Sequence, residues 1–212
     1  MVRNDAHPNI LNGHTPPDAV AMSSFPRAAT VFLQGDPAAH WYIVRQGVLR
    51  TCRFRLDGQR QLTGFYFPGD AVGFETGHYL TTAEAVTEAH VECYSQQSTP
   101  IASKQIERAL ANANRYIMLL GHRTASERVA AFLIGLPHDG NHVAVPMSRA
   151  DIADYLGLTI HTISRTFSDL FRSGLLTPKG RHRLRINAPG EIARLAGDGT
   201  DAPLMIKDSK HA

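Results

Sequence analysis

The chain has 212 residues, of which 43% are hydrophobic, so it is long enough to bury a substantial core in one large or two small domains. Its formal net charge of +3 is compatible with a nucleic-acid partner but does not identify one. Two cysteines, Cys52 and Cys93, exclude a disulfide framework and show no metal-binding spacing. We find no signal peptide and no long apolar run, and therefore expect a soluble cytoplasmic protein with no membrane partner.

The first half of the chain has a β pattern behind a polar start. Residues 1–24 contain several prolines and no periodicity, which predicts a flexible arm. In residues 25–99, β-branched and aromatic runs alternate with turn sequences, and Asp57-Gly58 is a strong hairpin signal. Glycines recur at positions 35, 47, 58 and 69. Short strands separated at such intervals indicate a closed barrel or a jelly roll.

A domain of this kind can hold a metal or a small molecule, so its histidines were considered as ligands. His40, His78 and His90 fall within the β region. A metal-dependent barrel enzyme requires histidines at adjacent inward positions together with a carboxylate, and the chain contains no His-x-His pair. We therefore expect no metal site, and keep a metal-dependent β-barrel enzyme as an alternative.

The apolar period becomes helical in residues 100–124. Positions spaced alternately by four and three residues form a narrow stripe: Ile106, Leu110, Ala113, Ile117, Leu120 and Thr124. Such a stripe is typical of a two-stranded coiled coil between identical chains. The alternative is a helix that packs its stripe against its own barrel. We expect a dimerisation helix.

Residues 125–197 are predicted to form a second domain. Its core face is expected to come from Val129, Phe132, Leu133 and Leu136. Residues 142–145 are expected to form a short strand. Residues 175–177 and 183–186, joined by a glycine turn, indicate a two-stranded wing, and 191–195 a closing helix. The composition of residues 198–212 predicts a flexible tail.

Within this domain, residues 148–176 read SRADIADYLGLTIHTISRTFSDLFRSGLL. Ser148 and Thr159 are suitable N-caps for two short helices, and Gly157 stands where the first helix should stop. Apolar residues at helical spacing give each helix one buried face. Two helices joined by a glycine turn form a helix-turn-helix, whose second helix enters the major groove of DNA.

The second helix is expected to expose a polar face near its N-terminus. If Ile163 and its helical neighbours face inward, the opposite face carries His161, Ser164, Arg165 and Ser168. The planar fork of arginine can pair with O6 and N7 of guanine together. The alternative is an ordinary helical hairpin with a solvated face. Basic residues clustered just after this helix favour a phosphate partner: Arg172, Lys179, Arg181, Arg183 and Arg185.

The run LGLTIHTISR resembles the DNA-binding motif of the CRP/FNR superfamily of bacterial transcription regulators, and especially its FixK branch. GFYFPGDAVGFET and the glycine spacing are similar to the same family, and the resemblance extends over residues 25–197. It implies an α+β protein with an N-terminal cyclic-nucleotide-binding-type β-roll, a long dimerisation helix and a C-terminal winged helix-turn-helix. It also implies a homodimeric activator, not an enzyme, that binds palindromic double-stranded DNA with TTGAT-type half-sites and recruits RNA polymerase.

The resemblance also implies roles for single residues. Base contacts are expected from His161, Ser164 and Arg165, where His161 replaces the glutamate that most relatives carry. Backbone contacts are expected from five residues at helix starts and at the wing: Arg149, Thr159, Thr162, Lys179 and Arg181. The interval from Cys93 to Glu127 is shorter than is usual in the family.

No cofactor is expected. A bound cyclic phosphate needs a cation, and no arginine lies between Arg60 and Lys104, which argues against cyclic AMP. A [4Fe–4S] cluster needs four thiolates, and residues 1–24 contain no cysteine. A haem- or small-ligand-responsive sensor of the same family is the alternative, and the sequence does not identify the controlling signal.

Overall fold

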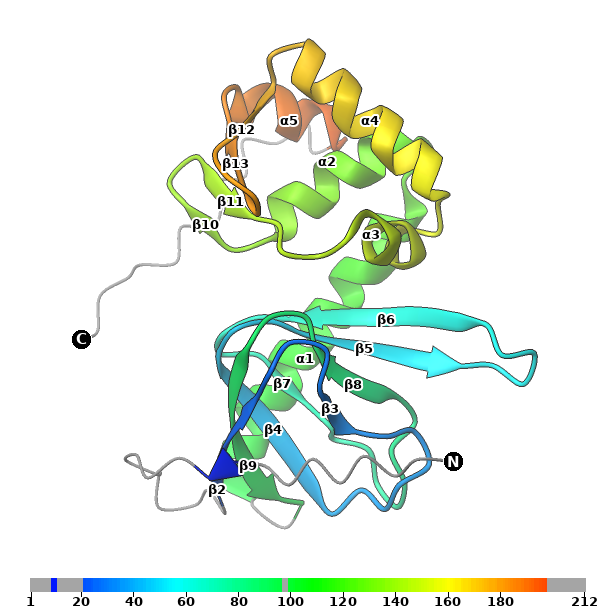
Figure 1. The fold of residues 1–212 in the computed structure, drawn as a ribbon, viewed down its shortest axis with the longest axis vertical. Helices are drawn as coiled ribbons and strands as arrows, with labels where there is room; N and C mark the ends of the chain where they lie inside the picture. Colours follow the sequence, from blue (N-terminus) through cyan, green and yellow to red (C-terminus); the bar gives the residue numbers. More distant parts are fainter. Residues whose placement is uncertain (1–8, 11–20, 97–98, 198–212) are drawn as a thin grey trace. The chain divides into compact units, whose positions relative to one another are not determined.

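A computed structural model describes residues 9–10, 21–96 and 99–197 of the chain. The polypeptide divides into two compact units, residues 1–113 and 114–212, and each is described by itself (Figure 1). The predicted tail at 198–212 and most of the predicted arm lie outside the described residues. The arm prediction is wrong where it can be compared, because Ala21–Phe25 forms strand β2 and Asn9–Ile10 forms β1, which pairs with it.

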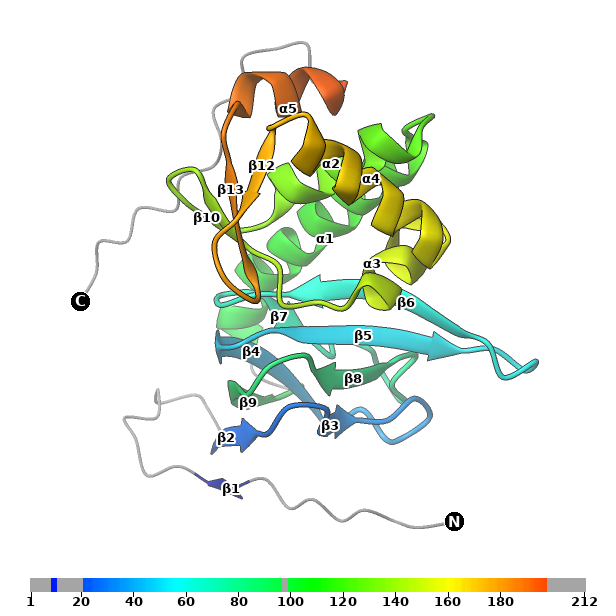
Figure 2. The same cartoon turned by 45° about the horizontal axis from the view of Figure 1, so that its top comes forward.

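The first unit contains two antiparallel sheets, as the glycine spacing predicted. One sheet has the order β1-β2-β9-β4-β7 and the other the order β3-β8-β5-β6. The remaining strands are β3 (Thr30–Phe32), β4 (His40–Gln46), β5 (Leu49–Phe54), β6 (Arg60–Tyr66), β7 (Ala71–Val72), β8 (Thr82–Ala85) and β9 (Ala89–Ser95). Figure 2 shows β5 and β6 as a long hairpin that extends from the roll, with Asp57-Gly58 in its turn.

Alternation along the strands buries both faces of the five-stranded sheet. In β4, Val44 packs in the main core with Phe32, Leu49 and Val91, whereas Trp41 belongs to a second cluster with neighbouring aromatic side chains. Gly47 begins the turn from β4 to β5 with a φ of 81°, and a Cβ there would lie 2.1 Å from the carbonyl oxygen of Glu88. No other residue type fits this close approach.

Helix α1 (Thr99–Gly121) follows the roll, as predicted, but ends earlier than the predicted limit of 124. Thr124 is instead the N-cap of α2 (Ala125–Gly135). Its hydroxyl accepts from the amide of Glu127 at 3.1 Å, and the Glu127 carboxylate accepts from the amides of Thr124 and Arg123. This reciprocal cap starts a new helix, so Thr124 is not a member of the apolar stripe.

The second unit is a helical core with a small sheet. Its elements are α2, β10 (His138–Asp139), β11 (His142–Ala144), α3 (Arg149–Leu156), α4 (Ile160–Arg172), β12 (Leu176–Pro178), β13 (Arg183–Ile186) and α5 (Pro189–Leu195). The sheet has the order β10-β11-β13-β12, and β12 and β13 form the predicted wing (Figure 1). Buried Leu133, Leu156, Phe167 and Ile186 come from α2, α3, α4 and the sheet.

Candidate nucleic-acid interface

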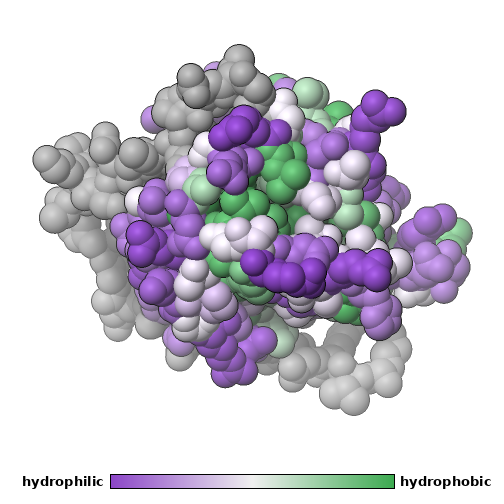
Figure 3. Space-filling view, turned by 90° about the horizontal axis from the view of Figure 1, so that it is seen from above, coloured by the Kyte–Doolittle hydropathy of each residue, from purple (hydrophilic) through white to green (hydrophobic). Residues whose placement is uncertain are grey.

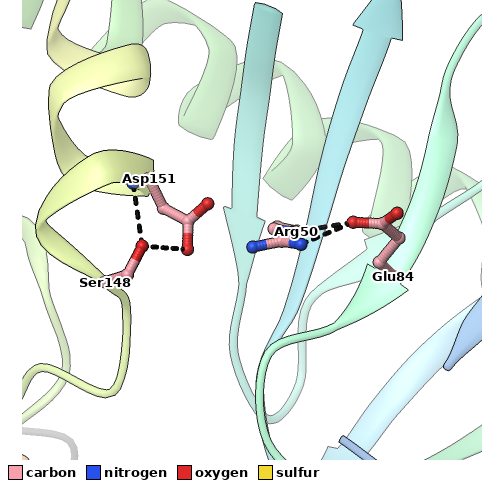
Figure 4. Close-up of polar contacts among 4 residues, drawn as sticks. All are labelled: Arg50, Glu84, Ser148 and Asp151. Carbon is pink, nitrogen blue, oxygen red and sulfur yellow. Dashed lines mark hydrogen bonds and ion pairs between the residues drawn. The ribbon is translucent and has the colours of Figure 1, made fainter. Parts of the chain in front are cut away.

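The first helix of the helix-turn-helix is fixed by its two ends. At the start, the Ser148 hydroxyl accepts from the Asp151 amide at 3.0 Å and donates to the Asp151 carboxylate at 2.7 Å (Figure 4). At the end, Gly157 has φ 63° and ψ 39°, the left-handed conformation that glycine adopts with least strain. The amide of Leu158 then donates to the Ala153 carbonyl at 2.9 Å. Both predicted caps are thus present.

Three residues separate the end of the first helix at Leu156 from the start of the second at Ile160. The Thr159 hydroxyl accepts from the amide of Thr162 at 3.1 Å, and the two hydroxyl oxygens lie 2.9 Å apart. Thr159 is exposed and Thr162 is half-buried. Both predicted phosphate-contacting threonines therefore stand at the N-terminus of α4, where free amides and the helix dipole favour an anion.

Helix α4 is divided sharply into an apolar and a polar face. Ile163, Phe167 and Leu170 are at most 4% exposed. The opposite face is open to solvent and consists of His161, Ser164, Arg165 and Ser168. The two faces fall where the sequence predicted them, because the hydrophobic period of this segment is unambiguous.

The polar face has unused hydrogen-bonding capacity. Arg165 forms no ion pair or hydrogen bond with any residue that the structure describes. The hydroxyl of Ser168 donates to the backbone carbonyl of Ser164 at 2.9 Å. Arg172, at the other end of the helix, is paired with Asp169 at 3.0 Å. The guanidinium near the N-terminus of α4 is therefore available to an external acceptor.

Arg149, predicted to contact the DNA backbone, also packs within the domain. Its guanidinium carbon lies 3.3 Å from the centroid of the Phe167 ring, and burial lowers the pKa of Arg149. A guanidinium stacked on a ring keeps its N–H donors in its own plane. Arg149 thus connects the start of α3 to the core of α4.

The wing presents two further cations. Lys179 and Arg181 are exposed in the turn between β12 and β13, and the Lys179 amide donates to the Arg183 carbonyl at 2.8 Å. The Arg183 side chain forms an ion pair with Asp139. Figure 3, which views the molecule from above, shows a face that is largely hydrophilic with a smaller hydrophobic patch near its centre.

The apolar stripe of α1 is exposed. Ile106, Leu110 and Ile117 have exposed fractions of 50%, 61% and 65%, and Ala113 is also exposed. On another face of the same helix, Arg108 and Asn112 approach the Asp70 carboxylate of the roll at 3.4 and 3.5 Å. Within the first unit, α1 therefore turns polar residues toward the roll and leaves Ile106, Leu110 and Ala113 uncovered, so this part of the stripe does not pack against its own barrel.

The interior of the roll is filled by aromatic side chains. The rings of Phe32 and Tyr79 stack with centroids 4.0 Å apart, and Tyr42 stacks on Phe32 at 5.7 Å. Two arginines of the roll are already paired. Arg45 lies 2.6 Å from Glu92, and Arg50 lies 2.7 Å from Glu84, the pair that Figure 4 shows.

The candidate metal ligands of the roll are dispersed. His40 lies in β4, His78 in the connection from β7 to β8, and His90 in β9. Across the described residues, no three histidine, cysteine or acidic side chains are grouped so that they could hold a metal ion. Nor does any helix in that part of the chain have the length and apolarity needed to cross a bilayer.

Comparison with known proteins decides the family. The model of the Crp-like helix-turn-helix domain matches residues 127–195, and that of the cyclic nucleotide-binding domain matches residues 22–99. The nitrogen fixation regulation protein FixK of Rhizobium meliloti is 34% identical over 173 residues, which cover 78% of this chain and 82% of that protein. The chain belongs to the CRP/FNR family of transcription regulators.

Other members of the CRP/FNR family support the same assignment. FixK of Bradyrhizobium diazoefficiens is 38% identical over 171 residues, which cover 72% of each chain. The structure of FixK2 from Bradyrhizobium japonicum is similar with a TM-score of 0.72 and 32% identity, covering 82% of this chain and 96% of that one. The chain is accordingly a regulator with a helix-turn-helix DNA-binding domain, and not an enzyme.

Sequence reasoning missed two contacts that hold the helix-turn-helix in place. Arg128 donates hydrogen bonds to two separate segments, and the rings of Tyr116 and Tyr155 stack with centroids 4.6 Å apart. The hydrogen bond from Arg128 to Leu156 and the stacking of Tyr116 on Tyr155 join residues far apart in the chain and depend on tertiary packing. No sequence signal indicated these contacts, because Arg128 directly follows the polar residues Ser126 and Glu127.

Proposed function

We propose that the chain is a homodimeric transcription activator that binds a palindromic operator and recruits RNA polymerase. The observation that carries this proposal is the exposed polar face of α4, in which Arg165 has no partner among the described residues. A helix that serves only to pack the core does not need an exposed, unpaired guanidinium beside a histidine and two serines. A helix that contacts base edges in a major groove needs such hydrogen-bonding groups on its exposed face.

Base and backbone contacts are assigned from where each side chain lies. Arg165 is proposed to pair with a guanine, Ser164 to contact a thymine, and His161 to read a neighbouring base. Thr159 and Thr162 at the N-terminus of α4 are proposed to hold phosphates. The same role is proposed for Arg149 at the start of α3 and for the two exposed cations of the wing, Lys179 and Arg181.

The dimer is supported by the exposed stripe on α1. Ile106, Leu110, Ala113 and Ile117 are exposed, and half-buried Leu120 continues the stripe toward the end of the helix. Pairing two copies of this stripe would remove it from water and relate the two DNA-binding units by a two-fold axis. Recognition helices about 34 Å apart would then meet successive major grooves, which requires an inverted repeat. We expect half-sites of the TTGAT type.

An iron–sulfur cluster does not fit this chain. Such a cluster needs about four thiolates, and the chain has two cysteines, both buried. Burial raises the pKa of the Cys93 thiol to about 11, so the neutral thiol dominates near pH 7. We therefore propose that DNA affinity is the same for protein purified in air and under nitrogen.

A binding-site selection tests the proposal. Random duplexes retained by the full-length protein should converge on an inverted repeat with a guanine at one fixed position in each half. An Arg165→Ala variant should retain the repeat but lose preference at that guanine. Retention of duplexes without a shared sequence, or of a single unrepeated motif, would contradict the proposal.

A further inference from the structure

The ends of two helices in the DNA-binding unit lack a cation of their own. Neither α1 nor α3 has a basic residue in its last turn. The last carbonyl groups of a helix have no partner within the helix and carry the negative end of its dipole. At the end of α3 the amides of Gly157 and Leu158 donate to the carbonyls of Asp154 and Ala153, and the carbonyl of Leu156 receives its donor from another helix of the unit.

That donor is Arg128, which lies on α2. Its Nε donates to the carbonyl of His122, directly after α1, at 3.0 Å. Its Nη1 donates to the carbonyl of Leu156, the last residue of α3, at 3.1 Å. Because the guanidinium is planar and its donors have fixed directions, one side chain defines the distance and the angle between the two carbonyl groups.

A second contact joins the same two helices. The ring of Tyr116 on α1 stacks on that of Tyr155 on α3, with centroids 4.6 Å apart and planes inclined by 23°. The Tyr155 ring also forms an edge-to-face pair with Phe132 of α2, with centroids 6.0 Å apart. The final turns of α1 are thus connected to α3 by stacked rings and by a bridging cation, two contacts of independent chemistry.

The connected part of α1 also carries the proposed dimer surface. Ile117, which is 65% exposed, directly follows Tyr116 in the chain. At the other end of the connection, α3 contacts α4 and passes directly into it through the turn at Gly157. The residues that pair two chains and the helix that reads DNA are therefore separated by a short series of packed groups.

We propose that Arg128 is a positioning residue that sets the half-site spacing to which the dimer responds. It holds α3, and through α3 the recognition helix α4, at a fixed orientation to the dimerising end of α1. The stacked pair of Tyr116 and Tyr155 supports the same orientation. This inference rests on the proposed function, because half-site spacing has meaning only for a dimer on an inverted repeat.

The spacing between the two DNA half-sites is a sensitive measure of the orientation of α4 relative to α1. One inserted base pair moves a half-site by about 3.4 Å and rotates it by about 35° around the DNA axis. A rigidly held pair of recognition helices cannot follow such a displacement, whereas a loosely held pair can. Loss of Arg128 should therefore weaken binding to the natural spacing and relax discrimination against altered spacings.

The test measures the affinity of full-length protein for three labelled duplexes by fluorescence anisotropy. All three carry the selected inverted repeat. The spacer between the half-sites has its natural length in the first, one base pair more in the second and one base pair less in the third. Arg128→Lys keeps the charge but cannot donate along two fixed directions. We expect about tenfold weaker binding to the natural spacer, as for loss of one hydrogen bond to a charged group, and a smaller affinity ratio between natural and altered spacers. Tyr116→Leu should shift the ratio in the same direction.

Arg123→Lys is the matched control. Arg123 is exposed between the end of α1 and the start of α2, and its side chain has no partner in the described part of the chain. It should keep the parent's affinities and ratio. If Arg128→Lys and Tyr116→Leu weaken all three duplexes equally and leave the ratio at the parent value, the positioning role is refuted. If the parent protein fails to prefer an inverted repeat, the proposed function fails instead.

Discussion

Helices α1 and α4 each leave one face uncovered, and the two faces differ in chemistry. On α1 the open face is apolar, with Leu110 and Ile117 more than 60% exposed, and the polar residues Arg108 and Asn112 turn toward Asp70 of the roll. On α4 the apolar residues Ile163, Phe167 and Leu170 are buried and the opposite, open face is polar. Each helix therefore packs one face within the chain and leaves the other exposed to solvent.

The difference indicates two kinds of partner. Removing an exposed apolar stripe from water is favourable, and a second identical stripe can provide this burial. A solvated polar face gains nothing from burial against an apolar surface, but its donors can exchange water for base edges. Substitutions on the apolar stripe of α1 should therefore affect dimer formation, and substitutions on the polar face of α4 should affect DNA recognition.

The largest effect is expected from placing a charge on the α1 stripe. Leu110→Glu would bury an unpaired carboxylate in the dimer at a cost of several kcal/mol, so monomers should predominate. Light scattering after size exclusion measures this. Ala111→Glu is the control, because Ala111 is also exposed but lies off the stripe, and it should remain dimeric. A dimeric Leu110→Glu protein would show that the chains associate elsewhere.

Removing the unpaired guanidinium of α4 should affect recognition without affecting assembly. Arg165→Ala should lose about 1–3 kcal/mol of operator binding and accept other bases at the guanine position. Anisotropy titrations with cognate and substituted duplexes measure both quantities. Arg172→Ala, which removes a guanidinium already paired with Asp169, should change the preference little. Equal losses for the two variants would place the base contact elsewhere.

The wing cations should contribute affinity without sequence preference. Neutralising Lys179 or Arg181 to Gln should weaken cognate and unrelated duplexes alike and reduce the slope of log affinity against log salt by about 0.9. The measurement is a series of titrations at increasing salt. Arg183→Gln removes a cation paired with Asp139 and should change the slope less. A loss confined to the cognate operator would instead assign these residues to base reading.

His161 should have the smallest effect and the most local one. A neutral imidazole offers one donor and one acceptor, whereas the glutamate of most relatives is an acceptor only. His161→Glu should therefore sharpen discrimination at one base pair in each half-site and leave the guanine preference unchanged. Selections with the parent, His161→Glu and His161→Ala compare the three. Identical consensus sequences would remove His161 from the base-reading set.

The sequence allowed most of the DNA-binding unit to be predicted, because its signals are local. Ser148, Gly157 and Thr159 mark helix ends through hydrogen bonds and dihedral angles within a few residues. The buried face of α4 was predicted from the helical spacing of its apolar residues. The early end of α1 could have been predicted as well, since Thr124 and Glu127 have the spacing of a capping box.

Long-range features could not be predicted in the same way. Strand β2 has no strong alternation, and it is stabilised by pairing with β9, where Ala21 lies opposite Cys93. The two carbonyl groups that Arg128 joins are 34 residues apart in the chain, from His122 to Leu156. Such contacts depend on how complete elements pack, which a single sequence does not specify locally.

The most direct test of the account is the stoichiometry and affinity of the complex with the selected palindromic duplex. Light scattering should give two chains per duplex. Replacing one half-site with unrelated sequence should lower the affinity by more than about a hundredfold, since each mismatched base pair costs about 1–3 kcal/mol. One chain per duplex, or equal affinity for the duplex with a single half-site, would contradict the claim that paired α1 helices present two copies of α4 to an inverted repeat.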